Sequence, residues 1–170
     1  ERIFIVGFNP EKLKLPENFE FQFPEKQELT RTIHDIVDDT IDDEKLFYRQ
    51  GQLYYDRMKD VITNPDTVYQ WRRVYIRENK SGVCPTLTAN MGEGGHNVPI
   101  ICTSKGIRKF TPEECLCFQG FPANRKEKPF SFPTTIAQSK KYKQAGNSVT
   151  EPLIHRVAEK VINNVKELEK

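Results

Sequence analysis

The sequence contains no apolar run long enough to cross a membrane, and its opening residues lack the basic and then apolar pattern of a signal peptide. Cysteine is scarce, and the four cysteines, Cys84, Cys102, Cys115 and Cys117, form no CxxC pair. We therefore expect no structural zinc site, and ordinary reduced thiols in a cytosolic protein. The first residue is Glu1 and not methionine, so we expect a segment of a longer protein.

A large net charge is also lacking, since the formal charge is only +2. With 29% charged and 36% hydrophobic residues, and a mean hydropathy of −0.67, the chain suits a soluble domain with a core. Basic residues are nevertheless clustered in four stretches, 70–80, 105–110, 124–128 and 140–143. One such cluster is usually a solvated surface. Four of them, two interleaved with aromatic residues, make a polyanionic partner an equal alternative.

A complete catalytic set is missing as well. None of the three histidines, His34, His96 and His155, lies near a serine or cysteine in a known motif, and we expect His155 to be partly exposed and structural. The Gly-rich stretch "MGEGGHN" (91–97) lacks the Lys-Ser/Thr of a phosphate-binding loop and reads as a loop between strands. Thr86 is open to two interpretations: a hydroxyl that positions a phosphate, or a β-branched residue in a cross-strand pair.

The patterning predicts strands in two parts of the chain. "RIFIVGF" (2–8) is typical of a buried strand of an α/β sheet, and "FEFQF" (19–23) alternates like an edge strand. From about residue 46 to residue 104, three short strand-like pieces, 45–49, 67–77 and 97–102, are separated by Gly, Asn and Pro. These pieces predict a small, irregular, β-rich domain with long loops.

Two helices are predicted near the carboxyl end. Thr111 as N-cap, Pro112 and Glu114 form a capping box, and Gly120 ends a helix over 112–119. A second helix is expected to begin near Ser148 to Thr150. Its apolar residues recur every three or four positions: Leu153, Ile154, Val157, Ala158, Val161, Ile162, Val165 and Leu168. Gly146, Asn147 and Ser148 would then lie at a helix start, where capping is favoured over ligand binding on spacing alone.

Two sequence blocks resemble the last two conserved blocks of the DNA (cytosine-5) methyltransferases. In "RKFTPEECLCFQGFP", the residues that match the first block are Arg108, Thr111, Glu114, Gln119, Gly120, Phe121 and Pro122. Phe110 stands where that family usually has leucine. In "YKQAGNSV", residues 146–149 match the second block. The opening "ERIFIVGF" resembles the end of the family's arginine block, with Arg2 as its final arginine, and the span between fits a variable target-recognition domain.

The resemblance implies a fold and a domain plan. The chain would be an α/β fragment, with the closing strand and C-terminal helices of an S-adenosylmethionine-dependent methyltransferase domain. This fragment would carry a small, irregular, mainly β target-recognition domain. The expected parts are a strand of the catalytic domain (1–12), the recognition domain (13–106) and helices returning to the catalytic domain (107–170). The expected partners are double-stranded DNA and the N-terminal catalytic half, in the bacterial cytoplasm at the nucleoid.

The resemblance also implies roles for single residues. The whole enzyme of a restriction-modification system would flip a cytosine from the duplex and methylate its carbon 5 with S-adenosylmethionine. Arg2 would contact the flipped cytosine, and Arg73 a guanine. The expected cofactor-binding residues are Gly146, Asn147 and Ser148. The expected DNA-binding residues are Arg72, Arg73, Arg77, Thr86, Thr88, Gly94 and Gly95.

The departures from the family pattern are equally informative. The family's nucleophile is a cysteine that follows a proline, whereas Cys84 precedes Pro85. The Glu-Asn-Val block and the F-x-G-x-G loop are absent from this sequence. We therefore expect no methyl transfer by this chain alone. Two alternatives stay open: a DNA-binding module without a catalytic partner, and a protein–protein interaction domain built on the apolar segment 2–8 and the last helix.

Overall fold

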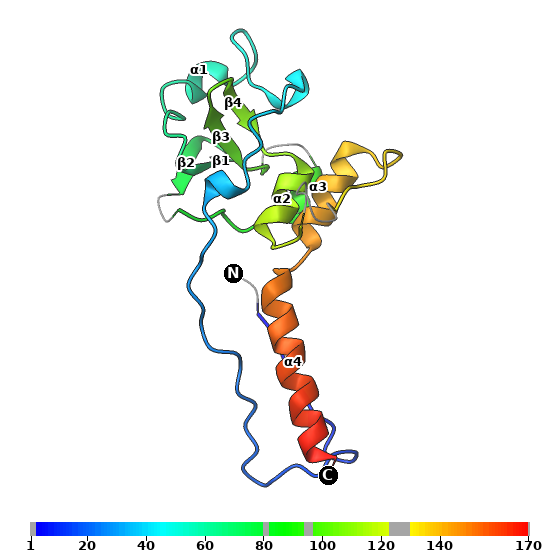
Figure 1. Cartoon of the computed structure of the whole chain (residues 1–170). Helices are drawn as coiled ribbons and strands as arrows, with labels where there is room; N and C mark the ends of the chain where they lie inside the picture. Colours follow the sequence, from blue (N-terminus) through cyan, green and yellow to red (C-terminus); the bar gives the residue numbers. More distant parts are fainter. Residues whose placement is uncertain (1–2, 80–81, 94–96, 123–129, 170) are drawn as a thin grey trace. The chain divides into compact units, whose positions relative to one another are not determined.

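The computed structural model describes residues 3–79, 82–93, 97–122 and 130–169 (Figure 1). The chain divides into two compact units. The smaller consists of Glu1–Glu28 and Thr150–Lys170, and the larger of Leu29–Val149. Each unit is described by itself below.

The larger unit is built on a four-stranded antiparallel sheet with the strand order β2-β1-β3-β4. Its strands are β1 (Val68–Arg72), β2 (Tyr75–Asn79), β3 (Ile100–Thr103) and β4 (Gly106–Lys109). The predicted strand-like pieces over 67–77 and 97–102 are confirmed as β1, β2 and β3. The strand expected near residues 45–49 is reduced to one bridge between Phe47 and Arg108. Strand β4 was not predicted, because its four residues lie within a basic cluster.

Both faces of the sheet are covered, because side chains alternate along each strand. One core contains Tyr69 and Trp71 of β1 with Met58 of the short helix α1 (Tyr55–Met58). The other contains Val68 of β1 and residues of four helices. These are the α-helices α2 (Pro112–Phe118) and α3 (Gln138–Asn147) and the 3-10 helices η1 (Ile33–Asp35) and η3 (Ala89–Gly92). Fully burying one such large side chain contributes about 1.5–3 kcal/mol. Another 3-10 helix, η2 (Glu44–Leu46), precedes the Phe47 bridge.

Helix α2 (Pro112–Phe118) forms where the sequence predicts it. The Thr111 hydroxyl accepts a hydrogen bond from the amide of Glu114 (3.0 Å), and the Glu114 carboxylate accepts one from the amide of Thr111 (2.7 Å). Gly120 follows at φ +87°, a conformation that glycine adopts without strain. Local signals thus fix both ends of this helix.

Helix α3 (Gln138–Asn147) was not predicted, and it corrects the interpretation of the Gly-Asn-Ser turn. Gly146 and Asn147 are the last residues of α3, and Ser148 is its C-cap, so these residues end one helix and do not begin the next. Helix α4 (Glu151–Leu168) starts three residues later, with Thr150 at its N-cap position. The expected start of the last helix near Ser148 to Thr150 is therefore confirmed. The Gly-Asn-Ser turn, however, lies at the carboxyl end of α3 and not at the amino end of α4.

The smaller unit consists of an extended amino-terminal segment and α4. Of the strands expected over 2–8 and 19–23, neither is present in the described residues 3–28, which contain no strand. A strand needs a neighbouring strand for its backbone groups, and the described residues of this unit supply none. Ile3 and Ile5 are 90% and 92% exposed, and of the predicted apolar stripe on α4 only Val157 is buried. Among the described residues, no helix has the length and apolar character that crossing a membrane requires.

Candidate functional site

Three exposed arginines lie on the β1–β2 hairpin. Arg72 is the last residue of β1, Arg73 lies in the turn, and Arg77 is in β2. Arg77 pairs with Gln70, and Arg72 pairs with Tyr75. Directly paired residues of antiparallel strands share a face, and Gln70 and Arg72 are two residues apart, so Arg72 and Arg77 lie on the same face of the hairpin. Arg73 adopts φ +37°, which is uncommon for a residue other than glycine.

The hairpin is tied to the Gly-rich stretch through Gln70. The Gln70 side chain is buried, and its amide Nε2 donates to the backbone oxygen of Asn97 at 3.4 Å. Asn97 is the last residue of that stretch, which spans 91–97. Gly94 and Gly95, which we predicted to contact DNA, lie outside the described residues, as does Arg2.

The Thr86–Thr88 segment belongs to no strand, and the backbone of Thr88 is extended. This removes the cross-strand pair as an explanation for Thr86. Leu87 is buried in the core, whereas Thr86 and Thr88 on either side of it are exposed. The buried leucine thus anchors a segment whose threonines face solvent, where a hydroxyl can reach a phosphate.

The Gly-Asn-Ser turn packs directly against this threonine segment. Gly146 is buried, and a Cβ atom added to it would lie 2.0 Å from the backbone oxygen of Thr88 and 2.7 Å from the amide nitrogen of Ala89. The lack of a side chain at Gly146 is therefore required by contact with protein backbone. The structure thus brings a predicted cofactor residue together with a predicted DNA-binding residue.

Asn147 and Ser148 differ in their surroundings. Asn147 is exposed, whereas Ser148 is half-buried and its hydroxyl donates to the backbone oxygen of Ala145 at 2.7 Å. With its proton committed to the helix end, the Ser148 oxygen can offer a ligand only its lone pairs. The carboxyl end of a helix carries partial negative charge, so this turn favours a cationic group over an anion.

A buried ion pair joins Arg108 of β4 to Glu114 of α2, and its role was not predicted. The Arg108 guanidinium donates to both carboxylate oxygens of Glu114 at 2.7 and 2.8 Å, and the two side chains are 1% and 4% exposed. Arg108 also donates to the backbone oxygen of Asp38, whose amide donates to Glu114. These bonds hold β4, α2 and the Asp38 segment together. The sequence signal that could have predicted this pair is that Arg108 and Glu114 lie equally far on either side of the N-cap residue Thr111.

Asp38 is itself electrostatically stabilised. Hydrogen bonds from Thr40 hold the pKa of the Asp38 carboxyl below its usual range, and the nearby charges of Arg108 and Lys105 act in the same direction. The carboxylate is therefore ionised at neutral pH.

Two of the cysteine thiols have environments unsuited to a nucleophile. Burial raises the pKa of the Cys84 thiol far above its usual range, and burial also raises the pKa of Cys115. Cys84 is half-buried against the core that contains Cys115. Both thiols therefore stay protonated near neutral pH, whereas a catalytic cysteine reacts as a thiolate.

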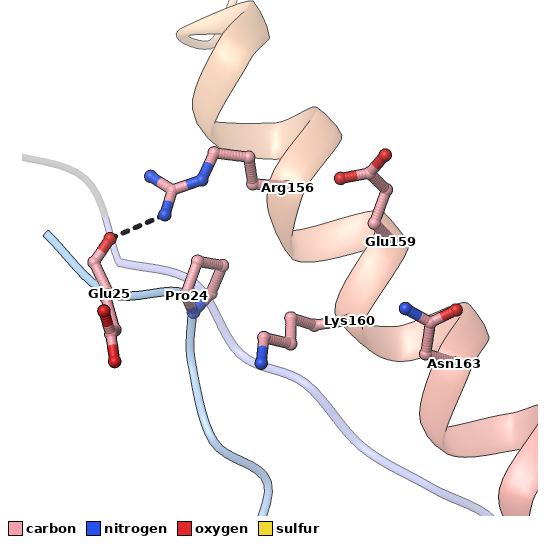
Figure 2. Close-up of a pocket in the computed structure, with 6 residues that line it drawn as sticks. All are labelled: Pro24, Glu25, Arg156, Glu159, Lys160 and Asn163. Carbon is pink, nitrogen blue, oxygen red and sulfur yellow. Dashed lines mark hydrogen bonds between the residues drawn. The ribbon is translucent and has the colours of Figure 1, made fainter. Parts of the chain in front are cut away.

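The smaller unit has an open hollow of about 300 Å³, lined by Pro24, Glu25, Arg156, Glu159, Lys160 and Asn163 (Figure 2). Arg156 donates to the backbone oxygen of Glu25 at 2.8 Å. Next to it on α4, His155 is exposed and pairs with Glu159 at 3.2 Å. No group of three or more His, Cys, Asp or Glu in the described part of the chain is arranged to hold a metal ion.

Exposed arginines and threonines around a small sheet form the kind of surface that nucleic-acid-binding proteins present. Residues 1–163 match the family of C-5 cytosine-specific DNA methylases. The chain is 48% identical over 168 residues to the type II methyltransferase M.Bsp6I of Bacillus sp. (strain RFL6), covering 97% of this chain and 50% of that protein. It therefore belongs to the C-5 cytosine-specific DNA methylase family, and the resemblance expected from the sequence is confirmed.

Two further relatives are more distant. M.SsoII of Shigella sonnei is 32% identical over 166 residues, which cover 97% of this chain and 40% of that protein. M1.ScrFI of Lactococcus lactis subsp. cremoris is 31% identical over 174 residues, which cover 100% of this chain and 41% of that protein. The chain thus spans half or less of the length of these three relatives.

Proposed function

We propose that the chain is the DNA-recognising part of a DNA (cytosine-5) methyltransferase of a bacterial restriction-modification system. The whole enzyme transfers a methyl group from S-adenosylmethionine to carbon 5 of a cytosine in a specific duplex sequence. The observation that carries this proposal is the family match combined with three exposed arginines on one hairpin. The corresponding location is the bacterial cytoplasm, at the nucleoid.

The DNA contacts divide into base reading and backbone contacts. Arg73, at the exposed hairpin turn, is suited to a bidentate contact with guanine, and Arg72 and Arg77 flank it. Thr86 and Thr88, which are exposed and alternate with buried Leu87, contact phosphates through their hydroxyls. In this proposal Gly94 and Gly95 approach base edges, and Arg2 contacts the flipped cytosine.

S-adenosylmethionine is assigned to the turn formed by Gly146, Asn147 and Ser148. The ligand contacts fall to Asn147, whose amide is exposed, and to the Ser148 oxygen. The cofactor carries a cationic sulfonium and an ammonium group, which suit the negative end of α3. Gly146 serves the site by its close packing against Thr88.

We further propose that this chain does not methylate DNA by itself. The protonated thiols of Cys84 and Cys115 supply no thiolate, and the relatives are at least twice as long as the matched region. The catalytic half supplies the nucleophile and most of the cofactor site. Exposed Ile3 and Ile5 belong to the strand that this half would complete. The proposed recognition domain remains 13–106, flanked by catalytic-domain segments 1–12 and 107–170.

The test is transfer of labelled methyl from S-adenosylmethionine to mixed-sequence duplex DNA. The chain is assayed alone and together with the amino-terminal half of M.Bsp6I. Activity only in the mixture is expected. Activity of the chain alone would overturn the assignment, and a Cys84→Ser variant would then show whether Cys84 reacts. Salt-sensitive DNA binding without activity in either sample would favour the second candidate, a sequence-specific DNA-binding module without catalysis, which the hairpin arginines also support.

A further inference from the structure

We propose that α3 is a positioning helix for DNA binding, and that Gly92, Lys143 and Gly146 fix the DNA-contacting threonine segment without touching DNA. This inference rests on the proposed function, since it concerns the segment assigned there to phosphate contact. The geometry that carries it is a pair of backbone contacts and one ion pair between α3 and the Thr88–Glu93 segment, all within the larger unit.

The two backbone contacts are reciprocal. Gly146 near the end of α3 lies against Thr88, and Gly92 at the end of η3 lies against the start of α3. A Cβ atom on Gly92 would be 2.1 Å from the backbone oxygen of Ser139 and 3.0 Å from the Cβ of Lys143. Backbone cannot move aside as a flexible side chain can. Both ends of η3 are therefore pinned to α3 at contacts that only glycine allows.

An ion pair adds a third attachment next to Gly92. The Lys143 ammonium lies 2.5 Å from the Glu93 carboxylate, with the side chains 39% and 59% exposed. This hydrogen bond from Lys143 also lowers the pKa of Glu93. An exposed pair of this kind contributes little to the stability of a fold. Its consequence here is geometric, because it links α3 to Glu93, which directly follows η3 and lies within the Gly-rich stretch.

The position of the threonine hydroxyls follows from these attachments. Thr88 directly precedes η3, and its backbone packs against Gly146. Only the buried Leu87 separates Thr86 from Thr88. A shift of η3 along α3 would move Thr88 away from a phosphate, and with it Met91, the residue of η3 that is buried in one of the two cores. The same shift would change the spacing between Thr88 and Asn147, which follows Gly146.

Removing the Glu93 charge distinguishes a positioning role from a simple electrostatic effect, because the two predict opposite changes in the affinity for DNA. Deleting a carboxylate near bound DNA strengthens binding if only net charge counts. If Glu93 positions the segment, Glu93→Gln weakens binding, by about three- to tenfold in Kd. The charge exchange of Glu93→Lys with Lys143→Glu keeps the net charge, rebuilds the pair, and restores binding to within about twofold.

The experiment measures Kd for a random-sequence duplex at fixed salt for the native chain, Glu93→Gln, the exchanged pair, and Glu113→Gln as a matched carboxylate control on α2. Amide hydrogen exchange over residues 88–93 is followed in the same samples. Weaker binding and faster exchange in Glu93→Gln only, both reversed in the exchanged pair, are expected. Equal or tighter binding by Glu93→Gln would overturn this inference and leave the proposed function standing. No binding by the native chain would overturn both.

Gly92→Ala is the stronger variant, with Gly7→Ala as its control, because a Cβ at Gly7 meets nothing within 4 Å. We expect weakened DNA binding from Gly92→Ala beyond that of Glu93→Gln, with no loss in Gly7→Ala. Native-like binding by Gly92→Ala would mean that η3 is not held by this contact, and would overturn the assignment of Gly92.

Discussion

Arg73 lies in a tight hairpin turn at φ +37°, a conformation that costs side-chain-bearing residues free energy. In the proposed function, the long charged side chain at this position reads a base. We expect Arg73→Gly to raise the free energy of unfolding by about 1 kcal/mol, because the strain is relieved. The same variant should lose discrimination between the target and random duplexes. Urea unfolding and paired Kd measurements test the two effects.

Thr86 provides the contrasting case. Thr86→Ala is expected to weaken binding to target and random duplexes alike, by about two- to tenfold, since a phosphate contact carries no sequence information. Thr86→Ser keeps the hydroxyl and serves as the control. The division of labour between Arg73 and Thr86 would be wrong if Arg73→Gly and Thr86→Ala each lost specific and random binding equally.

The Arg108–Glu114 pair is a matter of stability and not of DNA contact. Each partner is buried and would be left as an unpaired charge if the other were removed. We expect Arg108→Met to lower the free energy of unfolding by about 3–5 kcal/mol. Arg108→Met combined with Glu114→Leu should cost less, because no charge is stranded. Urea unfolding of the single and double variants measures the difference, and a double variant that is as unstable as the single one would contradict this account.

At the scale of elements, helix α2 shows what could be predicted from the sequence. Thr111, Pro112, Glu114 and Gly120 act through bonds and dihedral angles within one segment, so reading them in order locates the helix. Helix α3 has no comparable signals. Its N-cap residue, Ala137, makes no side-chain hydrogen bond, and its buried residues are few. Tertiary contacts of Gly92 and Gly146 hold it, and spacing along the chain does not reveal them.

The prediction of a strand in the amino-terminal segment was wrong for the opposite reason: its local signal was present, but its tertiary partner was not among the described residues. The apolar pattern of residues 2–8 is a genuine strand pattern, but pairing depends on a neighbouring strand that the described residues of the smaller unit do not contain. The hairpin β1–β2 was predictable because both of its strands are adjacent in sequence. The candidate site shows the same difference. Its exposed residues could be predicted from sequence motifs, whereas the contact of Gly146 with Thr88 joins residues far apart in the sequence and is visible only in the structure.

The docking of α3 should make stability depend on alkaline pH. The Tyr142 hydroxyl donates to the backbone oxygen of Phe110 at 2.6 Å, and burial raises the pKa of Tyr142. A group whose pKa is higher in the folded state contributes stability that is present below its unfolded pKa and is lost as pH rises above it. Unfolding free energy should therefore fall above about pH 10, the ordinary tyrosine value.

Burial also raises the pKa of Tyr48, so two tyrosines act in the same direction. Tyr142→Phe should reduce the alkaline decline without removing it. Urea unfolding at several pH values between about 8 and 11 measures the slope for native and variant chains. An unchanged slope in Tyr142→Phe would show that the Tyr142 hydroxyl does not contribute to this pH dependence.

At the scale of the whole molecule, the two units divide the proposed work. The larger unit has two cores of its own and carries the hairpin arginines, the threonine segment and the Gly-Asn-Ser turn. The smaller unit leaves apolar side chains exposed on both of its segments, among them Ile3, Ile5 and Ile162. DNA binding should therefore depend on the larger unit, and assembly of the active enzyme on the smaller.

This division predicts that Ile3→Asp with Ile5→Asp abolishes methyl transfer in the mixture with the catalytic half and leaves the Kd of the chain for duplex DNA unchanged. A charge at each of these positions would be buried unpaired when the strand joins the catalytic sheet, whereas in the chain alone both positions face water. Lys12→Gln with Lys14→Gln, in the same segment but outside the apolar run, lowers the net charge by the same two units and serves as the control. Retained methyl transfer by the isoleucine variant would show that residues 3–8 do not enter the interface. Loss of DNA binding together with methyl transfer would show that recognition and assembly use the same surface.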